Sequence, residues 1–240
     1  MSMHKLKTRN LILPLTGLCI IALTIYRSFE SVSGLSRTDP TYYTLLDENV
    51  IQLRQALKTA NSDEAKFRRK EDLALALWQN GKYSEAAEYL RDLWKEQESK
   101  CTAVSYNSHF VENALNLAGY YLDSGNFKES QRCYEIILKY EQNHLKSGDL
   151  RVARDQNNLG LSHYMMAQTS ASERSIELNK AMQCYKQAED AFRLCPSAKV
   201  QLLANLQNQA LALEDLGRWD SAHTLNAKVD AFLAAWHQTK

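Results

Sequence analysis

Two asparagines stand side by side in the stretch DQNNLGLSHYMMA, which runs from Asp155 to Ala167. Asn157 and Asn158 directly precede an apolar run, where amides are a poor choice on helix propensity alone. A primary amide carries both a donor and an acceptor, so it can pair with a peptide group whatever the neighbouring side chain is. The chemistry predicted for this pair is hydrogen bonding, either within the fold or to a bound peptide.

Residues of the same kind recur at matching places along the chain. Two residues before a small residue of each apolar stretch stand Asp72, Asn116, Asn158 and Asn208, which we call the amide column. One residue earlier stand Glu71, Leu115, Asn157 and Gln207. In a stack of helical repeats, equivalent positions line up along one face. The amides are therefore expected to form one row.

The composition favours helices as the elements that position these amides. The chain has 240 residues but only eight glycines and three prolines, which argues for an all-α protein. Lys and Arg number 29 against 28 Asp and Glu, so the charge balance gives no case for a nucleic-acid partner.

Four segments share one pattern of small, glycine and aromatic residues. Their first small residues follow one another in steps of 44, 42 and 50 residues, at Ala74, Ala118, Gly160 and Ala210. In three segments a glycine, an aromatic residue and a second small residue follow in fixed register: Gly81, Tyr83 and Ala86; Gly125, Phe127 and Ser130; Gly217, Trp219 and Ala222. The glycines are expected to end one helix in the left-handed conformation. The small residues are expected to let two antiparallel helices approach closely.

The third segment departs from this register. Its second small residue is Ala181, and nine extra residues separate it from Gly160. The extra residues fall within the polar stretch QTSASERSIELN. We expect either a surface loop or a slightly lengthened helix pair here.

This pattern resembles the tetratricopeptide repeat (TPR) family over roughly residues 65 to 236, and the stretches NNLGLSHY and ALNLAGYY resemble its kinesin-light-chain-like subgroup. The resemblance implies a right-handed superhelix of about four helix hairpins, at residues 67–100, 111–144, 153–200 and 203–236. It also implies a concave groove in which amides hold the backbone of an extended peptide. The groove residues expected on this basis are Asn116, Arg154, Asn157, Asn158, Tyr164, Gln207 and Asn208.

An alternative role for the same amides stays open. A buried asparagine can bond to the next helix and fix the stacking angle instead of binding a ligand. Leaving it unpaired would cost roughly 1–3 kcal/mol, so either role requires a partner. The neighbouring groove candidates are mainly acidic, namely Glu112, Asp123, Glu214 and Asp215. A basic or neutral peptide is therefore expected rather than an acidic chain terminus.

The N-terminal part of the chain differs from the repeats. Basic residues in 1–10 precede an apolar run at 11–26, which is predicted to be a transmembrane anchor or a cleaved signal peptide. The charge distribution keeps the N-terminus cytosolic and places the rest on the far side, in a bacterial periplasm or secreted after cleavage. A linker at 27–44 and a capping helix at 45–64 are expected before the TPR domain at 65–240, with Leu46, Val50, Leu53 and Leu57 on the buried helical face.

The C-terminal helix has no polar capping helix after it, although solenoid ends normally have one. Phe232, Leu233 and Trp236 are either packed inward or exposed as a self-association patch. A structural, self-associating repeat protein is accordingly the alternative to a peptide-binding scaffold.

We predict no catalytic residues, no cofactor and no metal site. The histidines are scattered without metal-ligand spacing, and no phosphate-binding loop or nucleophile motif is present. An enzyme site in the QTSASERSIELN stretch is a third hypothesis that none of its residues favours. Cys133 and Cys184 fall on apolar helix faces, where a free cysteine behaves as a small hydrophobe.

Overall fold

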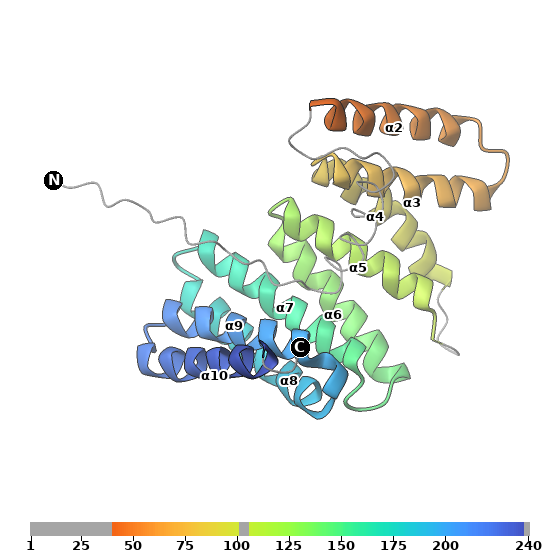
Figure 1. Cartoon of the computed structure of the whole chain (residues 1–240). Helices are drawn as coiled ribbons and strands as arrows, with labels where there is room; N and C mark the ends of the chain where they lie inside the picture. Colours follow the sequence, from red (N-terminus) through yellow and green to blue (C-terminus); the bar gives the residue numbers. More distant parts are fainter. Residues whose placement is uncertain (1–39, 101–105, 238–240) are drawn as a thin grey trace.

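The computed structural model describes residues 40–100 and 106–237, and all of its regular elements there are helical. They follow one another along a stack (Figure 1). The elements are α2 (Pro40–Lys58), α3 (Asp63–Gln79), α4 (Tyr83–Lys100), α5 (Ser108–Asp123), α6 (Phe127–His144), α7 (Leu150–Thr169), α8 (Arg174–Leu194), the short η1 (Pro196–Ala198), α9 (Lys199–Asp215) and α10 (Trp219–His237). The predicted all-α repeat fold is confirmed for this part of the chain.

Glycines end the first helix of three hairpins, as the sequence pattern predicts. Gly81, Gly125 and Gly217 have φ angles of 72°, 79° and 71°, a region that residues with a Cβ rarely adopt. The backbone N–H of each following residue bonds back into the helix, for example Lys82 to the Leu77 carbonyl at 2.9 Å. This left-handed turn reverses the chain and starts the second helix.

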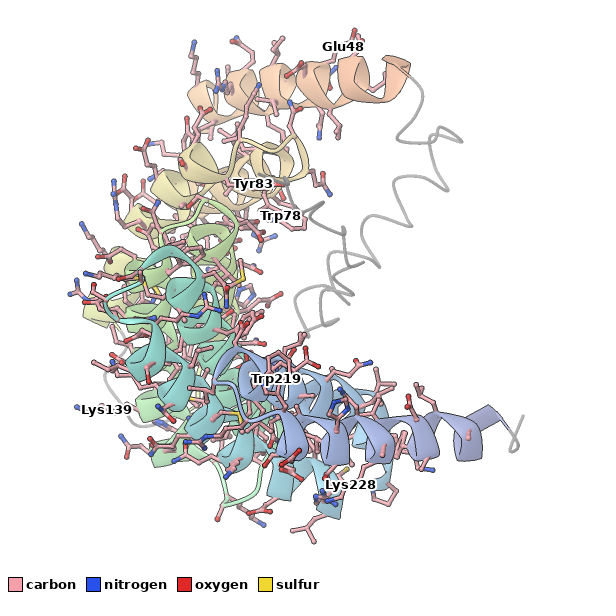
Figure 2. The ribbon with its side chains drawn as sticks, turned by 90° about the vertical axis from the view of Figure 1, so that its left-hand side faces the viewer. Glu48, Trp78, Tyr83, Lys139, Trp219 and Lys228 are labelled. Carbon is pink, nitrogen blue, oxygen red and sulfur yellow. The ribbon has the colours of Figure 1, made fainter. Side chains whose placement is uncertain are left out.

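Each helix packs against the next one in the chain, and α7 also contacts α9 in the following hairpin. The resulting stack is curved (Figure 2). Trp78 of α3 lies on the inner side of the curve, whereas Lys139 of α6 lies on the outer side (Figure 2). The largest core cluster runs from Val50 to Leu159 and includes Cys184.

The first described helix covers the first hairpin. Its buried face includes Leu46 and Val50, which are 1% and 2% exposed. Two ion pairs fix it from the side, one from Lys82 to Asp47 at 2.9 Å and one between Arg54 and Glu85. The helix starts at Pro40, within the segment expected to be a linker, because proline suits a first helical position where no N–H is needed.

A glycine brings the two helices of the third hairpin into close contact. A Cβ added to Gly160 would lie 2.6 Å from Tyr185 Cε1, so only glycine fits between α7 and α8 at this point. Tyr185 and Ala181 are fully buried on the facing side. The nine extra residues mostly lengthen the two helices, which extend to Thr169 and from Arg174.

A layer of polar side chains crosses the core beside α7. The hydroxyls of Ser130 and Ser162 lie 2.9 Å apart, and both residues are fully buried. Nearby, His163 Nδ1 lies 2.6 Å from Glu177 Oε2. Burial raises the pKa of Glu177, but hydrogen bonds from Lys180 and His163 outweigh this effect and hold its pKa below the usual value. These bonds satisfy groups that would be costly to bury unpaired.

The expected anchor or signal peptide at residues 11–26 lies outside the described residues. Among the helices that the structure describes, none combines the length and the apolar composition that crossing a bilayer requires.

Candidate protein-binding face

The amide column lies on the first helix of each hairpin, turned away from the second helix. The small residues that define the register, such as Gly160, face the second helix. A residue two positions earlier is rotated by about 200° around an α-helix, so it points to the opposite side. Asp72 is exposed and Asn116 is half-buried, while Asn158 and Asn208 are 2% and 4% exposed.

The two adjacent asparagines of α7 have different surroundings. Asn157 Oδ1 accepts a hydrogen bond of 3.0 Å from Asn205 Nδ2 of α9. The same Nδ2 also donates to the Tyr185 carbonyl at 2.9 Å. Asn157 therefore connects two hairpins, which is the inter-helix role that the sequence left open.

A connection of the same kind joins the first two hairpins. Asn113 Nδ2 of α5 donates to Glu71 Oε1 of α3 at 2.7 Å. Asn113 and Asn205 stand five residues before their first small residues, and Glu71 and Asn157 stand three before theirs. Sequence reasoning missed Asn113 and Asn205, although their matching register was the signal that would have found them.

Asn158 has neither of these connections. Its Oδ1 and Nδ2 atoms are both buried and have no hydrogen-bond partner among the described residues, and the same is true of Asn208 Nδ2. Unpaired buried amides cost roughly 1–3 kcal/mol each. The amide column thus holds unsatisfied polar groups at two of its positions.

Arg154 is engaged within the fold and does not face solvent freely. Its Nε donates to Asp155 Oδ1 at 2.6 Å, and Asp155 is fully buried. Glu141, also fully buried, lies next to this pair and accepts a 3.0 Å hydrogen bond from the Tyr106 hydroxyl. Burial and the neighbouring Asp155 carboxyl raise the pKa of Glu141 to about 8. The Arg154 guanidinium pairs with Asp155, and the raised pKa of the neighbouring Glu141 favours its protonated form at neutral pH.

The remaining predicted groove residues, Tyr164 and Gln207, are half-buried. Tyr164 lies near Asp215, and burial together with this carboxylate raises the pKa of Tyr164 to about 12. Asp215 also accepts a 2.7 Å hydrogen bond from Gln168 Nε2 and pairs with Arg174 at 3.0 Å.

Sequence reasoning missed Trp78 as a residue of this face. Its Nε1 donates to Asp123 Oδ2 at 2.6 Å, across from α3 to α5. The Trp78 ring also stacks on Tyr120, with centroids 5.8 Å apart. Trp78 stands four residues after its first small residue, as Tyr164 does, and this shared register was the available signal.

The predicted self-association residues lie on α10. Phe232 and Leu233 are half-buried, and the side chain of Trp236 lies outside the described part of the structure. Trp219, at the start of the same helix, is 57% exposed, whereas Phe127 at the equivalent place in the second hairpin is 9% exposed.

No group of three or more His, Cys, Asp or Glu side chains suited to a metal ion occurs within residues 44–95 and 106–234. A cavity of about 260 Å³ opens where α6 turns into α7, lined in part by Gln142, Gln156 and Gln187. These amides come from three different helices and do not belong to the amide column.

The fold and this face define the chain as a TPR-like helical solenoid. Among solved structures it is similar to a protein of Podosopora anserina with nearly identical TPR-like repeats, named after kinesin light chain. That match has a TM-score of 0.67 and 20% identity, and it covers 82% of this chain and 92% of that one. The chain is also similar to BtubC (BKLC) from P. vanneervenii, with a TM-score of 0.62, 18% identity, and coverage of 92% and 93%.

No family model and no curated protein matches the chain. The structural matches therefore establish the TPR-like fold.

Proposed function

We propose that the chain is a non-catalytic scaffold that binds an extended peptide segment of a partner protein along the amide column. The observation that carries this proposal is the unsatisfied state of Asn158, whose two polar atoms are buried without partners. Asn208 supports it with an unpaired Nδ2. A bound peptide backbone supplies both a donor and an acceptor, which is the complement of an amide.

Binding in this mode requires a small rearrangement. Asn116 is half-buried and accessible, but Asn158 and Asn208 lie below the surface. The peptide reaches them when the side chains around them change rotamer, a common change at interfaces. Contacts to main chain give affinity with weak dependence on the ligand sequence, and flanking side chains supply the preference.

We also propose a cellular location for this scaffold, based on the N-terminal segment. The apolar run at 11–26 anchors the chain in a membrane, the preceding basic residues stay cytosolic, and the solenoid stands on the far side. A secreted form after cleavage of the same segment is the alternative. Protease protection of the repeats in sealed vesicles, with exposure only after the membrane is opened, tests the orientation.

The peptide-binding role is tested by selecting binders from a random peptide library with the full-length chain. Each binder is then measured by fluorescence anisotropy on the wild type and on a variant with Asn116→Ala, Asn158→Ala and Asn208→Ala. We expect at least tenfold weaker binding to the triple variant. Lys139→Ala on the outer side of the curve is the matched control and should bind as the wild type does.

Two results count against the proposal. One is equal affinity of the triple variant, with its fold verified by circular dichroism. The other is a library that yields no binder at all.

Self-association is the second candidate function, and the exposure of Trp219 favours it. Light scattering over a range of concentrations should then show a dimer that Trp219→Asp or Trp236→Asp dissociates. A wild-type chain that stays monomeric at every concentration excludes it.

A further inference from the structure

Trp78, Tyr120 and Asp123 form a compact group on the inner side of the curve, which we call the aromatic–carboxylate site. The Trp78 indole donates to Asp123 Oδ2 at 2.6 Å and stacks on Tyr120 with an interplanar angle of 18°. Tyr120 is 4% exposed, so it supports the indole from below. Asp123 itself remains exposed. The site therefore presents a carboxylate beside an aromatic surface.

The chain contains a second arrangement of the same kind. Tyr164 occupies the repeat position of Trp78, and Asp215 occupies that of Asp123. The Tyr164 hydroxyl lies near the Asp215 carboxylate, as the Trp78 indole lies near that of Asp123. Here a cation is present: Arg174 Nη2 lies 3.0 Å from Asp215 Oδ1. The solenoid thus shows with its own side chain what an aromatic–carboxylate pair in this register accommodates.

The first site lacks that cation. Among the described residues, Asp123 has no ion pair, and its only hydrogen bond comes from Trp78. By contrast, Arg174 is supplied by the lengthened third hairpin, and no such insertion exists in the first one. A cation from outside the chain would complete this pair as Arg174 completes that of Asp215.

We propose that the aromatic–carboxylate site binds a guanidinium or ammonium group on the partner segment, so that the ligand of this face is a basic peptide. The inference rests on the proposed peptide-binding function and specifies its ligand class. Arginine is preferred to lysine, because its planar guanidinium stacks on an indole while its N–H groups reach the carboxylate. An acidic segment at the same place would meet Asp123 with like charge and bind weakly.

Two peptide pools test the preference against the full-length chain. Both have random sequence without Lys, Arg or citrulline, except for the central residue, which is arginine in one pool and neutral citrulline in the other. We expect the arginine pool to bind the wild type at least tenfold more tightly. Asp123→Asn should abolish that difference. Glu135→Gln is the matched control and should keep it, because Glu135 is an exposed carboxylate one helical turn from Lys139 on α6.

The outcomes separate this inference from the proposed function. If both pools bind the wild type equally, or if Asp123→Asn keeps the arginine preference, the aromatic–carboxylate site is not a cation site, but the peptide-binding function stands. If neither pool binds, the peptide-binding function fails and the ligand class fails with it. A direct readout is the indole N–H resonance of Trp78, assigned with Trp78→Phe, which should shift on addition of acetyl-arginine amide and stay unchanged in Asp123→Asn.

Discussion

Asn205 Nδ2 of α9 donates to Asn157 Oδ1 of α7 at 3.0 Å, so one of the two adjacent asparagines joins neighbouring hairpins. Its neighbour Asn158 is as deeply buried but has no partner for either polar atom. Residues one apart on a helix differ in direction by about 100°. That difference turns Asn157 towards α9 and leaves Asn158 unsatisfied, which is the structural basis for assigning them different roles.

Substitutions at these two positions should change stability in opposite directions. Asn158→Leu removes an unpaired buried amide and should raise the free energy of unfolding by about 1–2 kcal/mol. Asn157→Leu removes the acceptor of Asn205 and should lower it by about 0.5–1.5 kcal/mol. Urea unfolding of both variants measures these changes. Loss of stability in Asn158→Leu equal to that in Asn157→Leu would show that Asn158 has a structural partner.

Gly160→Ala should destabilise the third hairpin by about 1–3 kcal/mol, the usual cost of overpacking a core. The added Cβ would lie 2.6 Å from Tyr185 Cε1 and 3.1 Å from Cys184 Cβ, where no flexible chain end can yield. Gly81→Ala is a useful comparison, because its Cβ meets open space and only the φ of 72° opposes it. Thermal unfolding of the two variants and the wild type measures the loss of stability in each. A neutral Gly160→Ala would mean that α7 and α8 separate easily.

Stability should fall as the pH rises from about 4.5 to about 8 and then level off. Glu141 has a pKa of about 8 in the folded chain against 4.5 for an ordinary glutamic acid, with Asp155, Arg154, Tyr106 and Arg151 as the charged and titratable groups around it. Because the folded value is the higher one, the contribution of this group is complete below about pH 4.5 and is lost as the pH rises through about 8.

Glu141→Gln keeps the hydrogen bond to Tyr106 and cannot ionise. Its urea midpoint should therefore change less between pH 6 and pH 9 than that of the wild type. An identical loss in both proteins would place the pH dependence elsewhere.

The repeat pattern made much of the fold predictable. The positive φ angles of Gly81, Gly125 and Gly217 follow from glycine spacing, and the buried face of α2 follows from its apolar periodicity. The different surroundings of Asn157 and Asn158 could not be predicted from the repeat pattern. They depend on Asn205, a residue 48 positions away, whose side chain reaches α7 only after the hairpins stack.

Only some residues of the aromatic–carboxylate site could be predicted from the sequence. Asp123, Tyr164 and Asp215 stood out as groove candidates, but the partner of each carboxylate lies in another hairpin. Trp78 reaches Asp123 because the stack brings α3 and α5 within hydrogen-bond distance at this point. The shared register of Trp78 and Tyr164 shows that they occupy equivalent positions. It does not show that an aromatic residue of one repeat bonds to an acidic residue of the next.

The most direct test of the peptide-binding role observes the side-chain amides themselves. Full-length chain labelled with ¹⁵N-asparagine is titrated with a peptide selected from the library, and each side-chain NH₂ signal is assigned by substitution. We expect the signals of Asn116, Asn158 and Asn208 to shift and become protected from solvent exchange, while those of the connecting residues Asn113 and Asn205 stay in place. Bound peptide with the first three signals unmoved would contradict the peptide-binding role.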